Sequence, residues 1–149
     1  MVLGAYYLTT IKEGAKGEGM LFESINEMKK ALTAGIVEFQ AKVSVRIKKD
    51  AKDKGKIVES SVGRFIYNEG IPQDLGYVNR KEDPYSLEID TVADSSTLKD
   101  IVDKCFRKHG NIKTAEVLDY IKKTGYKYST LSGLTVSMAD VNIPKENGI

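Results

Sequence analysis

Few residues of this chain have the types and the spacing that catalysis or metal binding requires. His109 is the only histidine and Cys105 the only cysteine among the 149 residues. These two residues cannot supply a structural zinc site, nor a cysteine–histidine pair oriented by a third group. The acidic residues are numerous but form no Asp-x-Asp cluster that would hold two metal ions. The residues alone therefore predict no catalytic, cofactor-binding or metal-binding group.

The segment ESSVGRFIYNEGIP, residues 59–72, has the composition of a loop that holds phosphate, because serines precede a glycine–arginine pair. The same spacing is typical of a junction between a strand and a helix, with Ser60 or Ser61 as the helix N-cap. We favour the junction. In that interpretation Gly63 lies in the first helical turn and Arg64 is free to reach outward.

Two tyrosines flank a lysine near the C-terminal end of the chain. Tyr126 and Tyr128 beside Lys127 have the chemistry to stack on a nucleobase. An equally good interpretation packs one ring inward and exposes the other. The net charge is only +2, which is too small to predict nucleic-acid binding from electrostatics. A stand-alone nucleic-acid-binding module that uses Arg64, Lys127 and these tyrosines is therefore the weaker hypothesis.

The composition is that of an ordinary globular domain, with 41% hydrophobic and 30% charged residues. A chain of this length is most simply one domain with a core of its own. No apolar run approaches the roughly 18 residues of a membrane helix, and the first residues do not resemble a signal peptide. A single cysteine fits a reducing compartment. We expect a cytoplasmic protein with no membrane contact.

The N-terminal half of the chain contains helical and strand patterns in turn. Ser24 and Glu27 form a capping box ahead of a helix that Gly35 ends. Residues 42–48 alternate apolar and polar side chains, which predicts a strand. Residues 57–60 are expected to return as the second strand of a hairpin. The serine junction and its helix follow.

The C-terminal half is predicted to be mainly helical. Residues 73–97 have a weak pattern and indicate a long, variable surface connection, with a strand at 85–92 inside it. Ser96 is expected to cap a helix that Gly110 ends, and Gly125 is expected to end the next helix. The short gap between these helices predicts a helical hairpin.

The tail after the hairpin is expected to form a polar turn at Ser132–Gly133 and a strand over LTVSM, residues 134–138. Together these elements predict an α+β fold, in which a small antiparallel sheet packs with four to five helices. The chain is expected to divide into a mixed lobe over 1–72, the variable connection over 73–97, and the helical hairpin with its tail strand over 98–149.

Four blocks of sequence are distinctive when they are taken together and in order. They are VLGAYYLT at 2–9, KGEGM at 16–20, SSVGRFIYNE with the following Ile-Pro at 60–72, and the run from CFRKHGN to VNIP at 105–144. These blocks resemble the β′ subunit family of bacterial DNA-directed RNA polymerase over nearly the whole chain. The part of β′ that they resemble is the pore domain, so we expect an excised part of that subunit.

The resemblance implies a role in DNA-templated transcription. In this family the pore domain helps to wall the secondary channel, through which nucleoside triphosphates enter and the RNA 3′ end is extruded during backtracking. Transcript-cleavage factors dock at the rim of that channel. The implied partners are therefore the remainder of β′, the β subunit, nucleoside triphosphates, the RNA 3′ end and the cleavage factors. The implied location is the nucleoid-associated cytoplasm.

The resemblance places the catalytic groups of the nucleotidyltransferase elsewhere in β′. The Asp-rich loop that chelates magnesium in the family is absent from this sequence, and so are the family's zinc-binding cysteines. Mg and Zn are thus implied for the complete β′ subunit and not for this segment. The isolated chain is expected to be inactive.

The resemblance also suggests which residues contact the channel or neighbouring segments. These are Arg64, Lys127, Tyr128, Thr130, Ser132 and Gly133. Two positions depart from the family pattern. Leu131 stands where many members have arginine or lysine, and Gly70 stands where an aliphatic residue is commoner, which would loosen the preceding helix end. Apolar surfaces left by excision are expected first at residues 1–10 and second at LTVSM.

Overall fold

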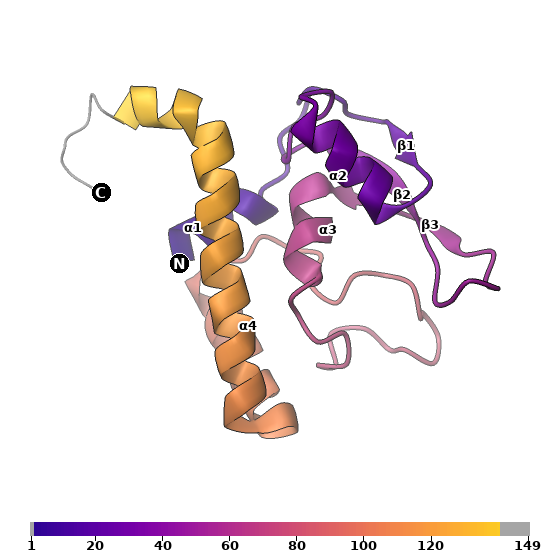
Figure 1. Cartoon of the computed structure of the whole chain (residues 1–149). Coiled ribbons are helices and arrows are strands. Elements are labelled where there is room, and N and C mark those ends of the chain that lie inside the picture. The colour runs from indigo at the N-terminus through magenta and orange to yellow at the C-terminus, as the bar shows by residue number, and fades with distance from the viewer. Residues whose placement is uncertain (1, 141–149) are drawn as a thin grey trace.

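A computed structural model describes the backbone of residues 2–140 and the burial of residues 4–128. The elements are α1 (Val2–Thr9), β1 (Leu21–Phe22), α2 (Ile25–Thr33), β2 (Lys42–Ile47), β3 (Lys56–Ser61), α3 (Val62–Asn68) and α4 (Ser95–Asp140). Figure 1 shows the sheet and α2 on one side of the molecule and α4 on the other. The predicted α+β class is confirmed.

The sheet has the order β1-β2-β3, and its predicted hairpin is confirmed. Strands β2 and β3 are antiparallel, and Val45 of β2 lies opposite Val58 of β3. Val43 and Val45 are fully buried, as the period of two predicted. The short strand β1 pairs parallel to β2 through Leu21 and Ser44, so the sheet is mixed. Two residues are too few for a periodic signal, and β1 was not predicted.

Serine caps begin both helices that flank the hairpin. The Ser24 hydroxyl accepts a 3.1 Å hydrogen bond from the Glu27 N–H, and Gly35 follows α2 with a φ of 76°. The Ser61 hydroxyl accepts a 3.1 Å bond from the Arg64 N–H at the start of α3. Ser61, rather than Ser60, is therefore the cap, and the predicted junction is confirmed.

The expected strand at 85–92 is wrong, because the structure has no strand between α3 and α4. Leu87 and Ile89 are nevertheless buried, which explains the misleading apolar pattern. The Asn68 amide donates to the Ile89 carbonyl and accepts from the Ile89 N–H, both at 2.8 Å. A single side chain thus satisfies the backbone groups that a neighbouring strand would have bonded.

The predicted helical hairpin is confirmed, and both of its arms belong to α4. Gly110 interrupts the helix with φ 86° and ψ −175°, values that only glycine adopts readily. The two arms run side by side in opposite directions (Figure 1). The Asp94 carboxylate accepts a 2.9 Å bond from the Thr97 N–H. Asp94 is therefore the N-cap of α4, and the prediction that Ser96 caps this helix is wrong.

The second arm of α4 does not end at Gly125, as predicted, but continues to Asp140. Gly125 lies against Gly4 of α1, and a Cβ added at Gly4 would come within 3.2 Å of the Gly125 Cα. Gly4 therefore permits the close approach of the two helices, and Gly125 lies at their contact without ending α4. The predicted turn at Ser132–Gly133 and the strand at 134–138 are wrong, since both lie in α4.

Residues 4–10 are the part of the first predicted apolar patch whose side chains the structure describes, and they are mostly not exposed. Helix α1 packs against α3 and α4. Ala5 and Leu8 are buried, and only Tyr6 is about half exposed among the large apolar side chains described there. The side chains of the second predicted patch, LTVSM, lie outside the described residues. The apolar pattern of α1 thus reflects packing within this chain.

Candidate functional site

Arg64 does not reach outward, as the sequence suggested, but holds three segments together. Its Nε donates to the Thr9 carbonyl at 2.8 Å. Its Nη1 donates to the Asp90 carbonyl at 3.0 Å and to the Asp90 carboxylate at 3.2 Å. Only 12% of the Arg64 side chain is exposed. The guanidinium is engaged in joining the end of α1, the start of α3 and the connection before α4.

The connection between α3 and α4 is organised by a carboxylate that the sequence gave no reason to select. The Glu88 side chain is fully buried and pairs with Arg80 at 2.9 Å. It also accepts a 2.7 Å bond from the Tyr77 N–H, while Gln73 accepts a bond from the Glu88 N–H at 3.0 Å. A buried carboxylate requires such partners, and together they fix a segment without regular secondary structure.

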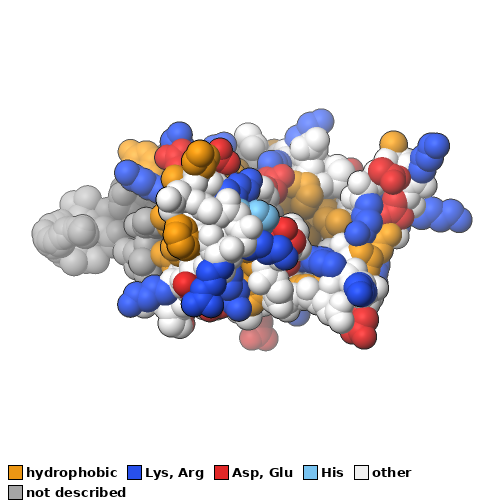
Figure 2. Space-filling view, turned by 90° about the horizontal axis from the view of Figure 1, so that it is seen from below, with side chains coloured by type: hydrophobic (Ala, Val, Ile, Leu, Met, Phe, Trp, Pro, Cys, Tyr) orange, Lys and Arg blue, Asp and Glu red, His pale blue; other side chains and the backbone are white. Residues whose placement is uncertain are grey.

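The elbow of α4, residues 106–113 around Gly110, is fastened to the same connection. The Lys108 Nζ donates to the Asp74 carbonyl at 2.7 Å, and the His109 Nε2 lies 2.8 Å from the Asp74 carboxylate. Figure 2 shows this end of the molecule, where blue and red side chains mix around the pale blue histidine. Arg107 is paired with Asp103. The elbow therefore presents mixed charge rather than a uniformly basic surface.

Lys127 and Tyr128 are the two predicted contact residues that the structure brings together. The Lys127 Nζ lies 5.2 Å from the centre of the Tyr128 ring. Tyr126 is 75% exposed, whereas Tyr128 is partly buried against the core. The interpretation with one ring inward and one outward is therefore confirmed. Thr130, Ser132 and Gly133 follow in the backbone of α4, and their side chains lie outside the described residues.

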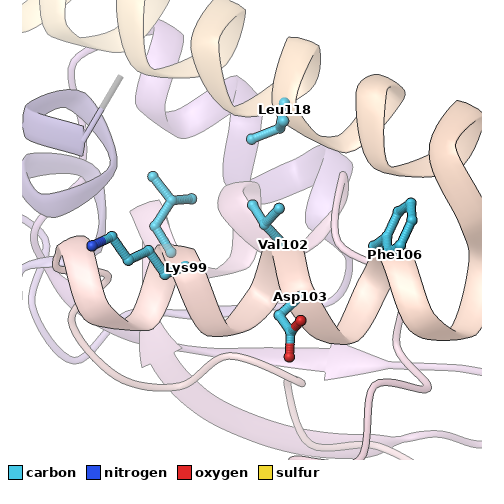
Figure 3. A pocket seen from close by; sticks show the side chains of 6 residues that line it. Lys99, Val102, Asp103, Phe106 and Leu118 are labelled. Atoms are coloured by element: carbon cyan, nitrogen blue, oxygen red, sulfur yellow. The ribbon is translucent and has the colours of Figure 1, made fainter.

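A groove of about 390 Å³ lies between the two arms of α4. It is lined by Leu98, Lys99, Val102, Asp103, Phe106 and Leu118. Figure 3 shows Val102 and Leu118 pointing toward one another across it, with Phe106 nearer the elbow. Leu98, Val102 and Phe106 follow one another at helical spacing on an apolar face of the first arm. In the structure one edge of that face is left at the surface.

Residues 1–141 match the family model described as RNA polymerase Rpb1, domain 3. The chain belongs to this family. The Rpb1 domain 3 match includes every described element, from α1 to the end of α4. The groove, the Arg64 contacts and the elbow are therefore all features of this domain.

Relatives of this Rpb1 domain 3 chain carry the name DNA-directed RNA polymerase subunit beta′. The chain is 54% identical over 148 residues to the protein of that name from Alkaliphilus oremlandii. It is 59% identical over 145 residues to the Finegoldia magna protein and 52% identical over 150 residues to the Clostridioides difficile protein. These alignments cover 97–100% of this chain but only 12–13% of each relative. The resemblance to β′ is confirmed.

Over the described residues, no group of three or more His, Cys, Asp or Glu side chains is placed to hold a metal ion. No helix in the same part of the chain is long and apolar enough to cross a membrane.

The elbow contact predicts a pH dependence of the stability of this domain. The hydrogen bond with His109 holds the pKa of the Asp74 carboxyl below its ordinary value of 3.8. A lowered pKa contributes stability that is present above the unfolded pKa and lost as the pH falls through the folded pKa. Asp74→Asn should therefore lower the urea midpoint at neutral pH, and this difference from the unmodified chain should shrink as the pH falls below 3.8, the ordinary pKa of the carboxyl. A difference that persists unchanged at low pH would contradict the assignment.

Proposed function

We propose that this chain is the part of β′ that walls the secondary channel of RNA polymerase. The observation that carries the proposal is the match of nearly the whole chain to one region of proteins named as β′ subunits. In this role the domain lines the path by which nucleoside triphosphates reach the active centre. The same path receives the RNA 3′ end when the enzyme backtracks.

A channel wall has to keep its position while nucleotides and RNA move past it. The Arg64 contacts fasten α1 to α3, and the Asp74 contacts fasten the elbow of α4 to the connection. Helix α1 is also packed closely on α4 where Gly4 meets Gly125. Hydrogen bonds and packing contacts between segments that are distant in sequence are expected of a fixed scaffold rather than of a mobile lid. These contacts support a positioning role.

The proposal assigns no catalytic step to this chain. Magnesium and zinc belong, by the resemblance, to other parts of β′. The contribution of this chain to nucleotidyl transfer is to shape the route to the active centre. Its proposed partners are the remainder of β′, the β subunit, nucleoside triphosphates, the RNA 3′ end and transcript-cleavage factors. The proposed location is the cytoplasm, at the nucleoid.

A chimeric enzyme tests whether the chain acts as a part of β′. The matching 150-residue region of the Clostridioides difficile β′ is replaced by this chain, and the subunit is assembled into RNA polymerase. We expect the chimera to assemble and to extend RNA on a DNA template. The isolated chain should extend no RNA under the same conditions, because the metal-binding carboxylates lie elsewhere.

The controls separate this proposal from the nucleic-acid-binding module. A chimera that carries an unrelated α+β domain of similar length should fail to assemble or to transcribe. Assembly of the intended chimera without RNA extension would contradict the proposal, as would RNA extension by the pure chain. Tight binding of single-stranded RNA to the isolated chain, with a steep dependence on salt, would favour the nucleic-acid-binding module.

A further inference from the structure

None of the contacts of Arg64, Glu88 or Asp74 described above involves a residue that lines the groove between the arms of α4. Phe106 is 51% exposed, and Ile112 at the elbow is 79% exposed. On the same arm as Phe106, Ile101 and Cys105 are completely buried. The first arm thus has one apolar face that is buried in the core and an apolar edge that is exposed. An apolar edge beside an open groove is typical of a surface that another segment covers.

The charges at the rim of the groove restrict what can cover it. Asp103 is already paired with Arg107 at 3.2 Å. Lys99 is exposed and, in the part of the chain with described side chains, has no ion pair. An occupant that packs apolar side chains against Val102, Phe106 and Leu118 would therefore bind more tightly if it also placed a carboxylate opposite Lys99. A basic occupant would meet an uncompensated positive charge.

We propose that the groove docks an apolar segment of the β′ polypeptide that lies outside these 149 residues and carries an acidic residue opposite Lys99. The inference rests on the proposed function, because it takes the chain to be embedded in β′. The matched relatives are far longer than this chain, which covers only 12–13% of them. The remainder of such a polypeptide is covalently attached, so it is present at a high effective concentration near the groove.

Site-specific photocrosslinking in the assembled chimeric polymerase tests this docking. A photoreactive phenylalanine analogue replaces Phe106 in one enzyme and Arg107 in a matched control. Arg107 is adjacent in sequence, 76% exposed in its side chain and not part of the groove. We expect the Phe106 probe to give several-fold more crosslink, joined to a β′ peptide from outside these 149 residues.

The other outcomes of this experiment contradict the proposal. A crosslink to the β subunit, to a second copy of β′ or to a regulatory protein would identify a different occupant. Equal yields from the Phe106 and Arg107 probes would show that the groove is not covered. Because the assembled chimera is assayed separately for RNA extension, a failure of the docking is distinguishable from a failure of the proposed function.

The charge of the occupant is tested by reversing the charge at position 99. Lys99→Glu should lower the crosslink yield from the Phe106 probe about two- to fivefold, the range expected for an exposed ion pair. Lys52→Glu makes the same change in net charge and should leave the yield unaltered, because Lys52 belongs to the loop between β2 and β3, which lies on the other side of the molecule from α4 (Figure 1). An unchanged or increased yield with Lys99→Glu would overturn the acidic part of the proposal.

Discussion

Replacing Gly63 with alanine should lower the free energy of unfolding by more than about 3 kcal/mol, or prevent folding. A Cβ at this position would lie 1.8 Å from the Leu8 carbonyl oxygen and 3.2 Å from that of Phe39. Both neighbours are backbone atoms, so no side-chain rotation relieves the overlap. The Gly63 N–H also donates to the Phe39 carbonyl at 2.7 Å, which holds α3 in place. Urea denaturation followed by circular dichroism measures the effect.

Gly125→Ala provides the matched control for this substitution. A Cβ at Gly125 would lie 3.4 Å from the nearest atoms of Gly4, which is ordinary van der Waals contact. Alanine also favours the helix by up to about 1 kcal/mol relative to glycine. This variant should therefore remain within about 1 kcal/mol of the unmodified chain. If the two alanine substitutions lower the free energy of unfolding by the same amount, the result would contradict the close approach of α1 to α3 at Gly63.

Arg64→Ala should lower the free energy of unfolding by about 2–3 kcal/mol. The substitution removes a charged donor and leaves the carbonyls of Thr9 and Asp90 without these bonds. Arg64→Lys should recover less than half of the loss, because a single ammonium cannot reproduce the guanidinium geometry. Chemical denaturation at fixed pH and salt compares the three proteins.

Arg107→Ala is the control for the loss of an arginine. Its side chain is 76% exposed and pairs with Asp103 one turn away on the same helix arm. Exposed pairs of this kind contribute little, so the variant should lie within about 0.5 kcal/mol of the unmodified chain. Full recovery of stability by Arg64→Lys, or equal losses at the two arginines, would contradict the role assigned to Arg64.

Local signals in the sequence were sufficient to predict the elements that begin at a capping serine or end at a glycine. The capped starts of α2 and α3 at Ser24 and Ser61 depend on a hydrogen bond three residues away. Gly110 ends the first arm of α4 with a backbone conformation that glycine favours. Strand β2 follows from alternation alone. These signals act within a few residues, so sequence reasoning can detect them.

Interactions between distant segments decided the elements that were predicted wrongly. The buried pattern around Ile89 resembles a strand, but its hydrogen bonds go to Asn68, which is 21 residues away. Gly125 resembles a helix end until Gly4 is found against it. Arg64 seemed free because its partners lie 26 and 55 residues away. The sequence near these residues therefore does not predict which distant residues they contact.

A tertiary contact explains why glycine is suited to position 70, where an aliphatic residue is commoner in the family. The expectation that glycine loosens the end of α3 stays a prediction, but the structure gives the glycine another reason, because the Tyr120 ring fills the space beside it. A Cβ at Gly70 would lie 1.8 Å from that ring, and the Tyr120 hydroxyl donates to the Ile66 carbonyl at 2.7 Å. The tyrosine thereby fastens the end of α3 to the second arm of α4.

Crosslinking from the RNA 3′ end tests the central claim most directly. Chimeric RNA polymerase is assembled on a template with an RNA that carries 4-thiouridine at its 3′ end, in backtracked and in non-backtracked complexes. We predict that the backtracked complex alone crosslinks to this chain, in the peptide that contains Lys127 and Tyr128. Crosslinks that never reach this chain, or that form equally without backtracking, would contradict its proposed place in the wall of the secondary channel.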